Sequence, residues 1–482
     1  MKAQEFAPAV YHRRMVPHLD IALDRRGGPS LVDQISGAIR VAIDDGVLAA
    51  GARLPSWRDL ATQLGVARGT VRQAYERLVD AQMIVTAGAA GTHVAARAAR
   101  SPRPPALPAP AYDHFRPDYP FGPVPFQMGV PAQDAFPVQV WARVMAQGAR
   151  TAAEMPVSYR DPRGEPVLRA RIAAHLAISR GLACDPAQVF VTNGFSGALD
   201  LVLRSLDLHG ATAWTEEPGF PIAREAVRLA GLVPAPVRVD AQGLDVAAGI
   251  ATAPHAALAM VTPGQQAPLG VTLSLARRHA LLDWAARTGA WIIEDDYLGE
   301  LQPDGRAAPA LASLDRAGRV CHIGTFSKTI TPSLRTGFLV VPPDLVPRVL
   351  EVANAFLTAP ALSLQHAVAA FIEDGRYLRH LRRMKRLYLD RRRGLVDALA
   401  QLSTTHAPAG LGVLLRLPDG VDEARVVKQA RAAGLAPVPL SPWYVTPELR
   451  QPGLLLGVTN VPEASAMALC QRLLAIVAAC GP

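Results

Sequence analysis

Lys328 lies in the segment IGTFSKTITPSLRTG and is one of only four lysines, because 46 of the 50 basic residues in this 482-residue chain are arginines. A guanidinium does not lose its proton in proteins, whereas a lysine amine can become neutral and act as a nucleophile. A chain so rich in arginine therefore has a chemical reason to keep an amine at this position. We interpret Lys328 as the candidate reactive residue.

Groups that suit a phosphate surround this lysine in the sequence. Arg335 follows a proline-containing turn, and its planar fork matches phosphate oxygens. Thr325 and Ser327 add hydroxyls on the approach to the lysine. Upstream, VTNGFSGALD is typical of a strand, a glycine turn and a helix start, where the free N–H groups of Phe195 and Ser196 would cradle a phosphate.

A second polar run, WIIEDDYLGE, adds groups that suit a pyridine ring. Asp295 and Tyr297 end an apolar strand two residues apart, so both side chains point to the same side of an extended backbone. A carboxylate there can keep a pyridine nitrogen protonated, and a phenol can donate to the ring oxygen. Phe220 in EEPGF offers a flat apolar face for stacking. Together these residues resemble the fold-type I pyridoxal 5'-phosphate enzymes.

Alternating helical and strand-like runs position these residues. Apolar runs such as QVFVTNG, AALAMVTP, AWIIEDDY and GRVCHIGTFSK are separated by helical patterns such as SGALDLVLRSL and RRHALLDWAARTG. This alternation predicts a parallel sheet with right-handed crossovers. Ligands bind beyond the carboxyl ends of such strands. Chemistry is therefore expected at the polar residues that follow the strands, which are Asn193, Thr262, Asp295 and Lys328.

The run from Gln127 to the C-terminus resembles an aminotransferase domain. The resemblance rests on YRDPRGEPVLRARIAAHLAISRG, TNGFSGALDL, EEPGF, EDDY and GTFSKTITPSLRTG. It implies that Lys328 carries the internal aldimine, that Asp295 meets the pyridine nitrogen and that Tyr297 meets the phenolate oxygen. The phosphate contacts that it implies come from Arg335, Thr325, Ser327 and Ser196. Tyr159 matches a tyrosine that reaches the phosphate of the partner subunit, which implies a homodimer.

Departures from the aminotransferase pattern weaken an ordinary transaminase reaction. Ala267 and Leu269, in TPGQQAPLG, stand where aminotransferases have N-P-T-G, so the asparagine that bonds the ring oxygen is missing. Leu455, in PGLLLGVTN, takes the place of the arginine that binds a substrate α-carboxylate. Arg416 or Arg450 could substitute for that arginine, and nothing in the sequence decides between them.

The N-terminal part has the pattern of a winged helix-turn-helix. Apolar residues after position 30 fall at the spacing of one helix face, and RDLATQLG and RGTVRQAYERLVDAQ predict two more helices around a turn at Gly65. The segment MIVTAGAAGTHVA predicts a two-stranded wing. The residues expected on the buried face of the third helix are Val71, Ala74, Tyr75, Leu78 and Val79.

Basic and hydroxyl residues cluster at the start of the third helix. Arg68, Thr70 and Arg72 would enter the major groove there, where arginine can pair with guanine and a hydroxyl can meet phosphates or base edges. Arg58, at the start of the second helix, would lie close to the DNA backbone. These four residues are the predicted DNA contacts.

The segment GARLPSWRDLATQLGVARGTVRQAYERLVDAQMI resembles the GntR family, and the resemblance covers residues 30–95. It implies that the four predicted residues occupy DNA-contacting positions. Ala67 stands where the family often has Ser or Thr. The wing tip AGAAGTH lacks the usual arginine, so His93 is the only candidate there that could carry charge.

The sequence divides into a DNA-binding domain (1–96), a linker with nine prolines (97–125) and an aminotransferase-like domain (126–482). A net charge of +9 is compatible with a nucleic-acid partner. The four cysteines are widely spaced with no Cys-x-x-Cys pair, so neither a disulfide framework nor a metal site is expected. The sequence has neither a membrane-spanning apolar run nor a signal peptide, which predicts a cytoplasmic protein without a membrane partner.

A winged helix, a Pro-rich linker and an aminotransferase-like domain in this order resemble the MocR family of bacterial regulators. The resemblance implies an α/β fold class, with a fold-type I large domain built on a mostly parallel sheet and an α+β small domain. It also implies a head-to-tail, domain-swapped homodimer on double-stranded operator DNA. The expected function is transcriptional regulation by aldimine exchange at Lys328, in response to a small amine, an amino acid or pyridoxal phosphate, with little or no transaminase turnover. The alternative is an active aminotransferase with an accessory DNA-binding domain.

Overall fold

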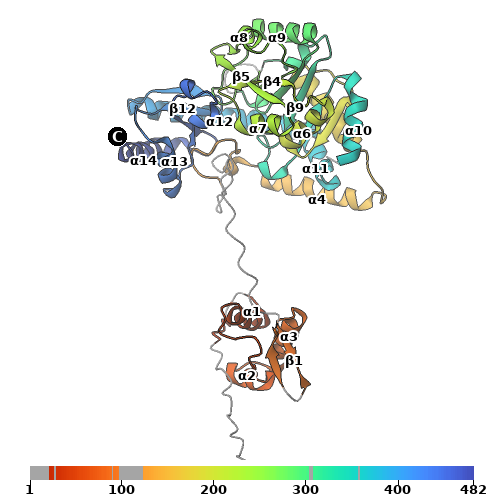
Figure 1. The fold of residues 1–482 in the computed structure, drawn as a ribbon, viewed down its shortest axis with the longest axis vertical. Coiled ribbons are helices and arrows are strands. Elements are labelled where there is room, and N and C mark those ends of the chain that lie inside the picture. The colour runs from red at the N-terminus through yellow and green to blue at the C-terminus, as the bar shows by residue number, and fades with distance from the viewer. Residues whose placement is uncertain are drawn as a thin grey trace, which may run out of the picture. The chain divides into compact units, whose positions relative to one another are not determined.

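The computed structural model describes residues 21–25, 29–88, 91–96, 123–302, 308–356 and 359–481. The chain divides into two compact units, Met1–Ala109 and Pro110–Pro482 (Figure 1). Most of the predicted linker, 97–125, and the predicted domain boundary after residue 96 lie outside the described residues.

The described residues of the first unit form three helices followed by a hairpin. Its elements are α1 (Leu31–Asp44), α2 (Trp57–Leu64), α3 (Arg68–Asp80), β1 (Ile84–Thr86) and β2 (Thr92–Val94). The two strands pair antiparallel, with Val85 opposite His93. This is the predicted order of three helices and a wing.

Local signals in the sequence set the helix ends of this unit. Ser30 and Ser56 cap α1 and α2, and each hydroxyl accepts a hydrogen bond of 3.2 Å from the N–H of the aspartate three residues on. Helix α2 ends at Gly65 in the left-handed conformation, with φ of 61°, which favours glycine. The resulting tight turn brings α3 against α2.

An apolar core joins the three helices and the hairpin. Its α3 residues are Val71, Ala74, Tyr75 and Leu78. These four positions follow the i, i+3, i+4, i+7 stripe of one helix face. The expectation for Val79 is wrong, because it lies at the margin of that stripe and is 37% exposed. The Tyr75 hydroxyl donates a hydrogen bond of 2.9 Å to the Pro55 carbonyl, which fixes the buried ring.

The second unit is built on an eight-stranded sheet with the order β3-β10-β9-β8-β7-β4-β5-β6. Strands β9, β8, β7, β4 and β5 run parallel to one another, whereas β10 and β6 are antiparallel to their neighbours. The bounds are β3 (Val189–Thr192), β4 (Thr212–Glu217), β5 (Val233–Asp240), β6 (Gly243–Leu244), β7 (Leu258–Val261), β8 (Trp291–Asp296), β9 (Val320–Thr325) and β10 (Gly337–Val340). The predicted mostly parallel sheet is confirmed.

Helices cover both faces of this sheet (Figure 1). Adjacent residues of β8 show the two layers, since Ile293 packs with α6, α7 and α10 while Ile292 packs with α8 and α9. The helices are α4 (Val138–Glu154), α5 (Pro166–Ser179), α6 (Gly194–Leu206), α7 (Pro221–Leu229), α8 (Val246–Thr252), α9 (Leu275–Thr288), α10 (Val346–Phe356) and α11 (Leu362–Ile372).

A C-terminal lobe completes this unit (Figure 1). Its antiparallel sheet has the order β11-β12-β14-β13. The elements are α12 (Arg376–Gln401), β11 (His406–Ala409), β12 (Gly412–Arg416), α13 (Glu423–Ala432), β13 (Val438–Pro439), β14 (Gly453–Gly457) and α14 (Ala466–Ala479). This is the predicted α+β small domain.

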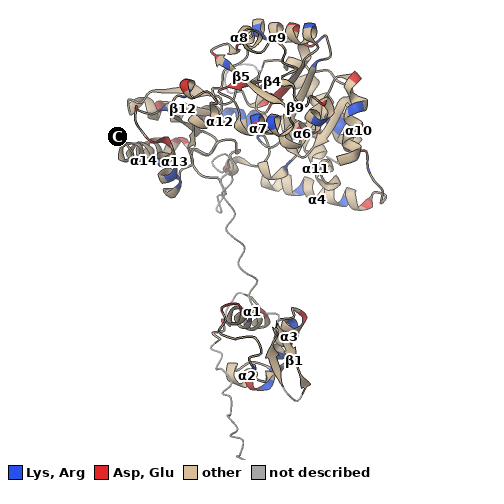
Figure 2. Ribbon diagram, viewed as in Figure 1, with Lys and Arg blue, Asp and Glu red and all other residues tan. Residues whose placement is uncertain are grey.

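Helix α12 carries a cluster of nine lysines and arginines between residues 376 and 393 (Figure 2). Two of its arginines are tied to the segment before α4: Arg383 bonds the Ala135 carbonyl, and the buried Arg391 pairs with Asp134. That part of the cluster therefore supports the fold. Among the described residues, no helix combines the length and apolarity needed to cross a lipid bilayer.

Candidate functional site

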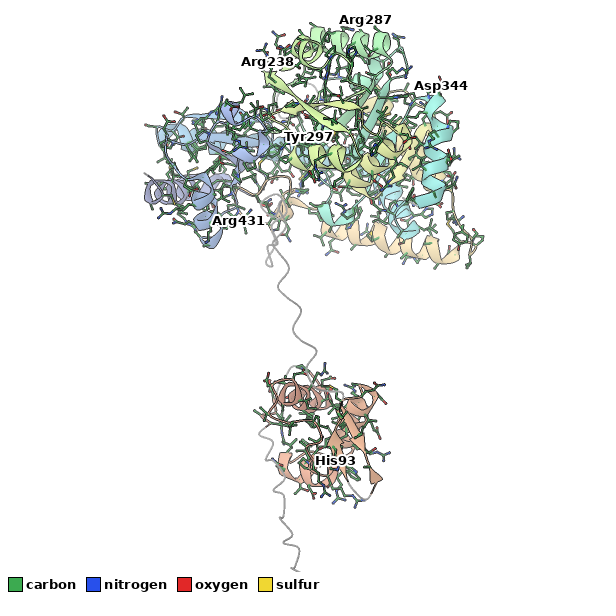
Figure 3. All side chains as sticks on the ribbon, in the orientation of Figure 1. His93, Arg238, Arg287, Tyr297, Asp344 and Arg431 are labelled. Atoms are coloured by element: carbon green, nitrogen blue, oxygen red, sulfur yellow. The ribbon has the colours of Figure 1, made fainter. Side chains whose placement is uncertain are left out.

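Four strand ends meet at one edge of the large sheet. Strand β9 ends at Thr325, just before the predicted reactive lysine, and β8 carries Asp295 and leads to Tyr297. Strand β4 leads to Phe220, and β3 leads to the start of α6. Because β3 and β9 are both antiparallel to β10, their carboxyl ends lie at the same edge as those of β8 and β4. Tyr297 is labelled in Figure 3.

Lys328 contacts a backbone carbonyl from a distant part of the chain. Its Nζ donates a hydrogen bond of 2.9 Å to the oxygen of Gly129. Gly129 has a φ of +74°, and a Cβ on it would lie 2.6 Å from Nζ. The positive φ therefore favours a glycine where the chain passes the amine. Sequence analysis missed Gly129, because the two residues are 199 positions apart.

Asp295 is a buried acid with an unpaired oxygen. It is 6% exposed, and its Oδ1 has no hydrogen-bond partner among the described residues. Burial, and then the carboxylates of Asp296 and Glu216, raise the pKa of Asp295 well above its usual value, and Lys328 only partly opposes this. A cationic hydrogen-bond donor at this oxygen would offset both the cost of burying the acid and the repulsion from the neighbouring carboxylates. Burial and then Asp295 also raise the pKa of the Tyr297 phenol.

Glu216, at the end of β4, is a site residue that sequence analysis did not predict. It accepts hydrogen bonds from the Thr262 amide (3.1 Å), the Thr262 hydroxyl (2.5 Å) and Gln266 Nε2 (3.2 Å). Burial raises the pKa of Glu216 to about 7, although these hydrogen bonds oppose the rise. The EEP segment gave a signal for it, but the contacts depend on strands β4 and β7 being neighbours.

The residues predicted to bind a phosphate lie around the start of α6. Gly194 opens this helix with a φ of +72°, and a Cβ on it would lie 3.8 Å from Arg335 Cα. Arg335 is exposed and itself left-handed, with φ of 48°. The Ser327 amide donates to Thr325 Oγ1 at 3.2 Å. The first amides of α6, at Phe195 and Ser196, belong to a helix start, where N–H groups lack intrahelical partners.

Phe220 lies between the two lobes of the unit. Its ring centroid is 6.2 Å from that of Phe195 and 5.7 Å from that of Trp443. It lines a small cavity together with Asp295 and Thr262. The predicted stacking residue is therefore next to the predicted ring-nitrogen residue.

Tyr159 does not lie with the other residues predicted to bind the cofactor. It follows α4 and is 96% exposed, so its phenol faces solvent rather than the site of its own chain. Nearby Val157 is also fully exposed.

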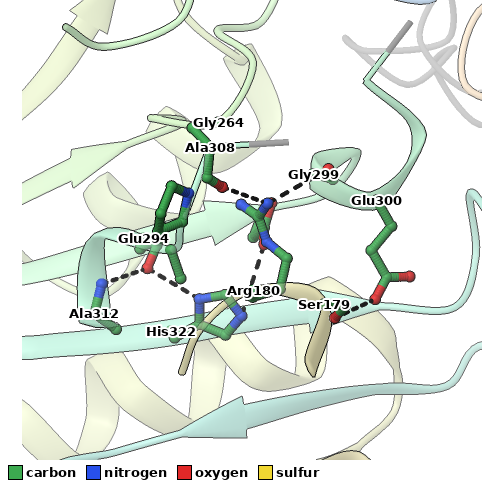
Figure 4. Close-up of polar contacts among 12 residues, drawn as sticks. Ser179, Arg180, Gly264, Glu294, Gly299, Glu300, Ala308, Ala312 and His322 are labelled. Carbon is green, nitrogen blue, oxygen red and sulfur yellow. Dashed lines mark hydrogen bonds and ion pairs between the residues drawn. The ribbon is translucent and has the colours of Figure 1, made fainter. Parts of the chain in front are cut away.

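A buried polar network lies beneath the sheet edge (Figure 4). Arg180 Nε bonds Asp296 Oδ2 at 2.6 Å, and His322 Nδ1 lies 3.0 Å from Glu294 Oε2. Burial alone would lower the pKa of His322, but the Glu294 carboxylate raises it. Burial would likewise raise the pKa of Glu294, but His322 lowers it to about 2. The network holds β8 and β9 in register under the predicted site.

The residue after Lys328 is bonded directly to α12. The buried Thr329 hydroxyl lies 2.9 Å from the Tyr377 hydroxyl, and the Thr329 carbonyl lies 2.7 Å from His380 Nε2. Tyr377 also donates to Glu300 at 2.9 Å. Because α12 continues into the C-terminal lobe, these bonds connect the lysine segment to that lobe.

The first unit carries the predicted DNA contacts on α2 and α3. Arg58, Arg68 and Arg72 are exposed, and Thr70 is half-buried. Arg72 Nε lies 2.9 Å from Glu76 Oε1, so a DNA contact by Arg72 would compete with this exposed pair. The guanidinium of Arg58 lies 4.8 Å from the centre of the neighbouring Trp57 ring. Basic residues on both helices are visible in Figure 2.

The start of α3 and the wing differ from the expected pattern. Ala67 occupies the N-cap of α3 and makes no side-chain cap bond, so the first amides of the helix lack that internal acceptor. His93, labelled in Figure 3, lies on β2, and its Nδ1 is 3.3 Å from the Gly51 carbonyl. Sequence analysis missed Arg53, whose Nε would be 3.0 Å from a Cβ on Gly91. Arg53 therefore supplies a cation at the wing.

Comparison with known proteins identifies both units. Residues 31–94 match the gntR family of bacterial regulatory proteins, and residues 124–452 match the aminotransferase class I and II family. The probable rhizopine catabolism regulatory protein MocR of Rhizobium meliloti is 36% identical over 464 residues, which cover 92% of each chain. The chain belongs to the MocR family of transcriptional regulators.

A further relative and a solved structure are also similar to this chain. The MocR-type chain is 34% identical to the pyridoxine biosynthesis transcriptional regulator PdxR of Corynebacterium glutamicum, over 81% of this chain and 83% of the relative. Among solved structures, an archaeal alanine:glyoxylate aminotransferase aligns with a TM-score of 0.68 and 25% identity, covering 74% of this chain and 91% of the other. The chain is thus a helix-turn-helix regulator with an aminotransferase-like domain, in a family that typically binds pyridoxal phosphate.

Proposed function

We propose that this MocR-family regulator binds pyridoxal 5'-phosphate and responds to a primary amine that takes the place of Lys328 on the cofactor. The observation that carries the proposal is the buried, unpaired Asp295 oxygen at the same sheet edge as Lys328. An unpaired buried acid costs folding energy unless a ligand pairs with it. A protonated pyridine nitrogen is such a ligand.

The residues present fit the cofactor. Asp295 would hold the pyridine nitrogen, Tyr297 would donate to the ring oxygen, and Phe220 would stack on the ring. The residues that would hold the phosphate are Thr325, Ser327, Arg335, Ser196 and the amide of Phe195. When bound, pyridoxal phosphate supplies an electrophilic carbon that primary amines attack.

Effector binding would release the lysine. As the bond to the effector nitrogen forms, the carbon–nitrogen bond to Lys328 breaks, and two hydrogens pass from the effector nitrogen to the Lys328 nitrogen. The freed Lys328 amine would keep the Gly129 carbonyl as a hydrogen-bond acceptor. Thr329 would transmit the change to Tyr377 and His380 on α12, since it is bonded to both. The equilibrium between different positions of the C-terminal lobe would then shift.

A homodimer follows from the same proposal. The exposed Tyr159, next to the exposed Val157, is available to reach the phosphate of a second chain. The head-to-tail, domain-swapped arrangement would place the winged helix of each chain against the large unit of the other. Measuring molecular mass in solution, with the Tyr159→Phe variant assayed for cofactor affinity, tests this part.

Amine titration of the cofactor-loaded protein separates a sensor from an active aminotransferase. For a sensor we expect one equivalent of amine per chain to change the cofactor absorbance, without formation of a keto acid. Sustained keto-acid turnover with an acceptor would show the alternative function. In a Lys328→Ala variant with the cofactor still present, the absorbance before amine addition should be that of the free aldehyde rather than of the lysine-bound cofactor, which is the control for the reacting residue.

Operator recognition is tested at the start of α3. Arg72→Ala should weaken binding to the operator about 5- to 100-fold and reduce the salt dependence of binding. The matched control is Arg40→Ala, which removes an exposed arginine from α1. Fluorescence anisotropy on labelled operator DNA measures both variants. Equal affinities and equal salt slopes would reject the assignment of Arg72.

A further inference from the structure

A row of exposed arginines runs along one face of α12. Arg379, Arg382, Arg386 and Arg393 are exposed and follow the spacing i, i+3, i+7 and i+14, which places them on one side of a helix with 3.6 residues per turn. We call these four residues the α12 stripe. The buried side chains of the helix, such as Leu381, lie on the opposite side. At 1.5 Å per residue the stripe is about 21 Å long.

The α12 stripe has few acidic neighbours. Arg393 Nη1 lies 4.0 Å from Asp390 Oδ1, whereas no ion pair holds Arg379, Arg382 or Arg386 among the side chains that the structure describes. The positions three and four residues away from Arg382 hold one leucine and three basic residues. Like charges at this spacing destabilise a helix. The stripe therefore carries an unfavourable repulsion that an anionic partner would offset.

Two other helices of the same unit balance their surface arginines internally. On α6, Arg204 Nε lies 2.8 Å from Asp200 Oδ1, and on α10, Arg348 Nη1 lies 2.7 Å from Glu351 Oε2. In both pairs the acid is three or four positions from the arginine. An unbalanced row of arginines is the pattern expected where the anion comes from another molecule.

The chemistry of the α12 stripe suits a row of phosphates. A guanidinium presents a planar pair of donors that matches phosphate oxygens. Each strand of duplex DNA carries one phosphate per 3.4 Å of helix axis, so a contact about 21 Å long passes about six phosphates of one strand. A duplex therefore offers phosphates along the whole length of the stripe.

The rest of α12 favours DNA over a lipid surface. A helix that lies in a bilayer interface inserts its apolar face, but the apolar face of α12 is buried in the core of its own unit, at Tyr377, Leu381 and Met384. DNA, by contrast, is the partner of the gntR-type unit of the same chain. Because the two units are covalently joined, a second contact to bound DNA gains from a high effective concentration.

We propose that the α12 stripe is a second DNA-binding surface, which contacts phosphates of the same duplex that the winged helix reads. Contacts to phosphates add affinity without adding sequence preference. The aminotransferase-like unit thus holds DNA as well as the effector. The inference does not depend on amine exchange at Lys328, and its test uses no amine.

The test replaces the three stripe arginines that lack an ion pair among the described side chains. The variant Arg379→Gln/Arg382→Gln/Arg386→Gln keeps the helix, since Gln and Arg have similar helix propensities. The full chain is titrated by fluorescence anisotropy against the operator duplex and against a scrambled duplex of equal length and composition, at several salt concentrations. We expect the affinity for both duplexes to fall about 3- to 150-fold. The slope of log affinity against log salt should fall by about 0.9 for each lost phosphate contact, or by about 2 to 3 in all.

A matched control removes the same net charge elsewhere. Arg287→Gln/Arg316→Gln/Arg425→Gln changes three exposed arginines on three separate elements of the same unit. Charges more than about 10 Å from a phosphate are largely screened at 0.1 M salt, so this variant should keep the affinity and the salt slope of the unmodified chain. Thermal unfolding and cofactor absorbance establish that both variants remain folded.

Three results would overturn the inference. Equal losses in the stripe variant and in the control would show that only the net charge matters. A stripe variant with unchanged affinity and slope on both duplexes would show that this surface does not touch DNA; if its molecular mass in solution also changes, the stripe joins two chains instead. A loss confined to the operator duplex would show that the variant disturbs the winged helix, because phosphate contacts do not depend on base sequence.

Discussion

Replacing Asp295 with Asn should stabilise the cofactor-free chain and weaken cofactor binding at the same time. In the cofactor-free chain this buried acid has an oxygen without a partner among the described residues, close to Asp296 and Glu216. An unsatisfied buried polar group costs about 1 to 3 kcal/mol. Asn has the same shape and still leaves one polar atom unpaired, but it carries no charge, so the part of the cost that comes from repulsion by Asp296 and Glu216 should disappear at neutral pH. Cofactor binding, by contrast, loses a charge-assisted hydrogen bond worth about 1.5 to 3 kcal/mol, or about 10- to 150-fold in Kd.

The pH dependence of stability sharpens this prediction. Because the folded chain holds the pKa of Asp295 above its unfolded value, the folded state binds more protons than the unfolded state. The contribution of Asp295 to the free energy of unfolding is therefore fully present below its unfolded pKa, near 4, and is lost as the pH rises toward its raised folded pKa. Glu216 adds to the same slope between about pH 4.5 and its raised pKa of about 7. Asp295→Asn should flatten the slope but not abolish it, since Glu216 remains.

Thermal unfolding and cofactor titration check both halves of the prediction. We expect the Tm of the cofactor-free Asp295→Asn chain to rise by about 2 to 5 °C at pH 7, while the cofactor Kd increases. Asp344→Asn, on an exposed carboxylate labelled in Figure 3, is the matched control and should change neither. An Asp295→Asn chain that unfolds at a lower temperature and keeps its cofactor affinity would show that Asp295 supports the fold rather than the ring.

Two further predictions concern packing and the connection to α12. Tyr377→Phe removes the hydroxyl that bonds Thr329 and Glu300, at a cost of about 1 to 3 kcal/mol in the free energy of unfolding. We expect this variant to bind the amine, as followed by cofactor absorbance, but to lose amine-induced release of the operator, as measured by anisotropy. A retained operator response would contradict this link. Gly148→Ala places a Cβ 2.3 Å from the Ser363 carbonyl oxygen and should cost at least about 1 to 3 kcal/mol by thermal or urea unfolding. The control Gly37→Ala, in a helix where nothing lies within 4 Å of the new Cβ, should gain about 0.5 to 1 kcal/mol, and equal effects of the two changes would contradict the packing argument.

The fold and the core of the candidate site were predictable because both leave local signals. Asp295, Tyr297 and Lys328 are polar residues that directly follow apolar runs, and parallel strands bring such positions to one edge. Helix caps at Ser30 and Ser56 likewise lie within three residues of their partners. Short-range rules were sufficient for these features.

The residues that sequence analysis missed depend on contacts between distant segments. Gly129 is recognisable only once the chain before α4 is known to pass the Lys328 amine. Arg53 belongs to the wing because the strand bridge to His93 brings it there, although the sequence separates them by a helix-turn-helix. Val79 was assigned to the buried face of α3, and only the packing of the neighbouring helices shows where that face ends. Pairings of this kind carry no periodicity that a single sequence reveals.

The C-terminal lobe is joined to the ring site from two directions. The segment after Lys328 is bonded to α12, through Thr329. On the other side, Glu217 Oε1 accepts hydrogen bonds of 2.7 Å from the amides of Val445 and Thr446, and the Gly219 amide donates to the Trp443 carbonyl at 3.0 Å, just before the stacking residue Phe220. A ligand that moves either the lysine segment or the Phe220 ring therefore strains bonds to the same lobe. Because both connections end there, we infer that an effector would act on the position of this lobe relative to the large sheet.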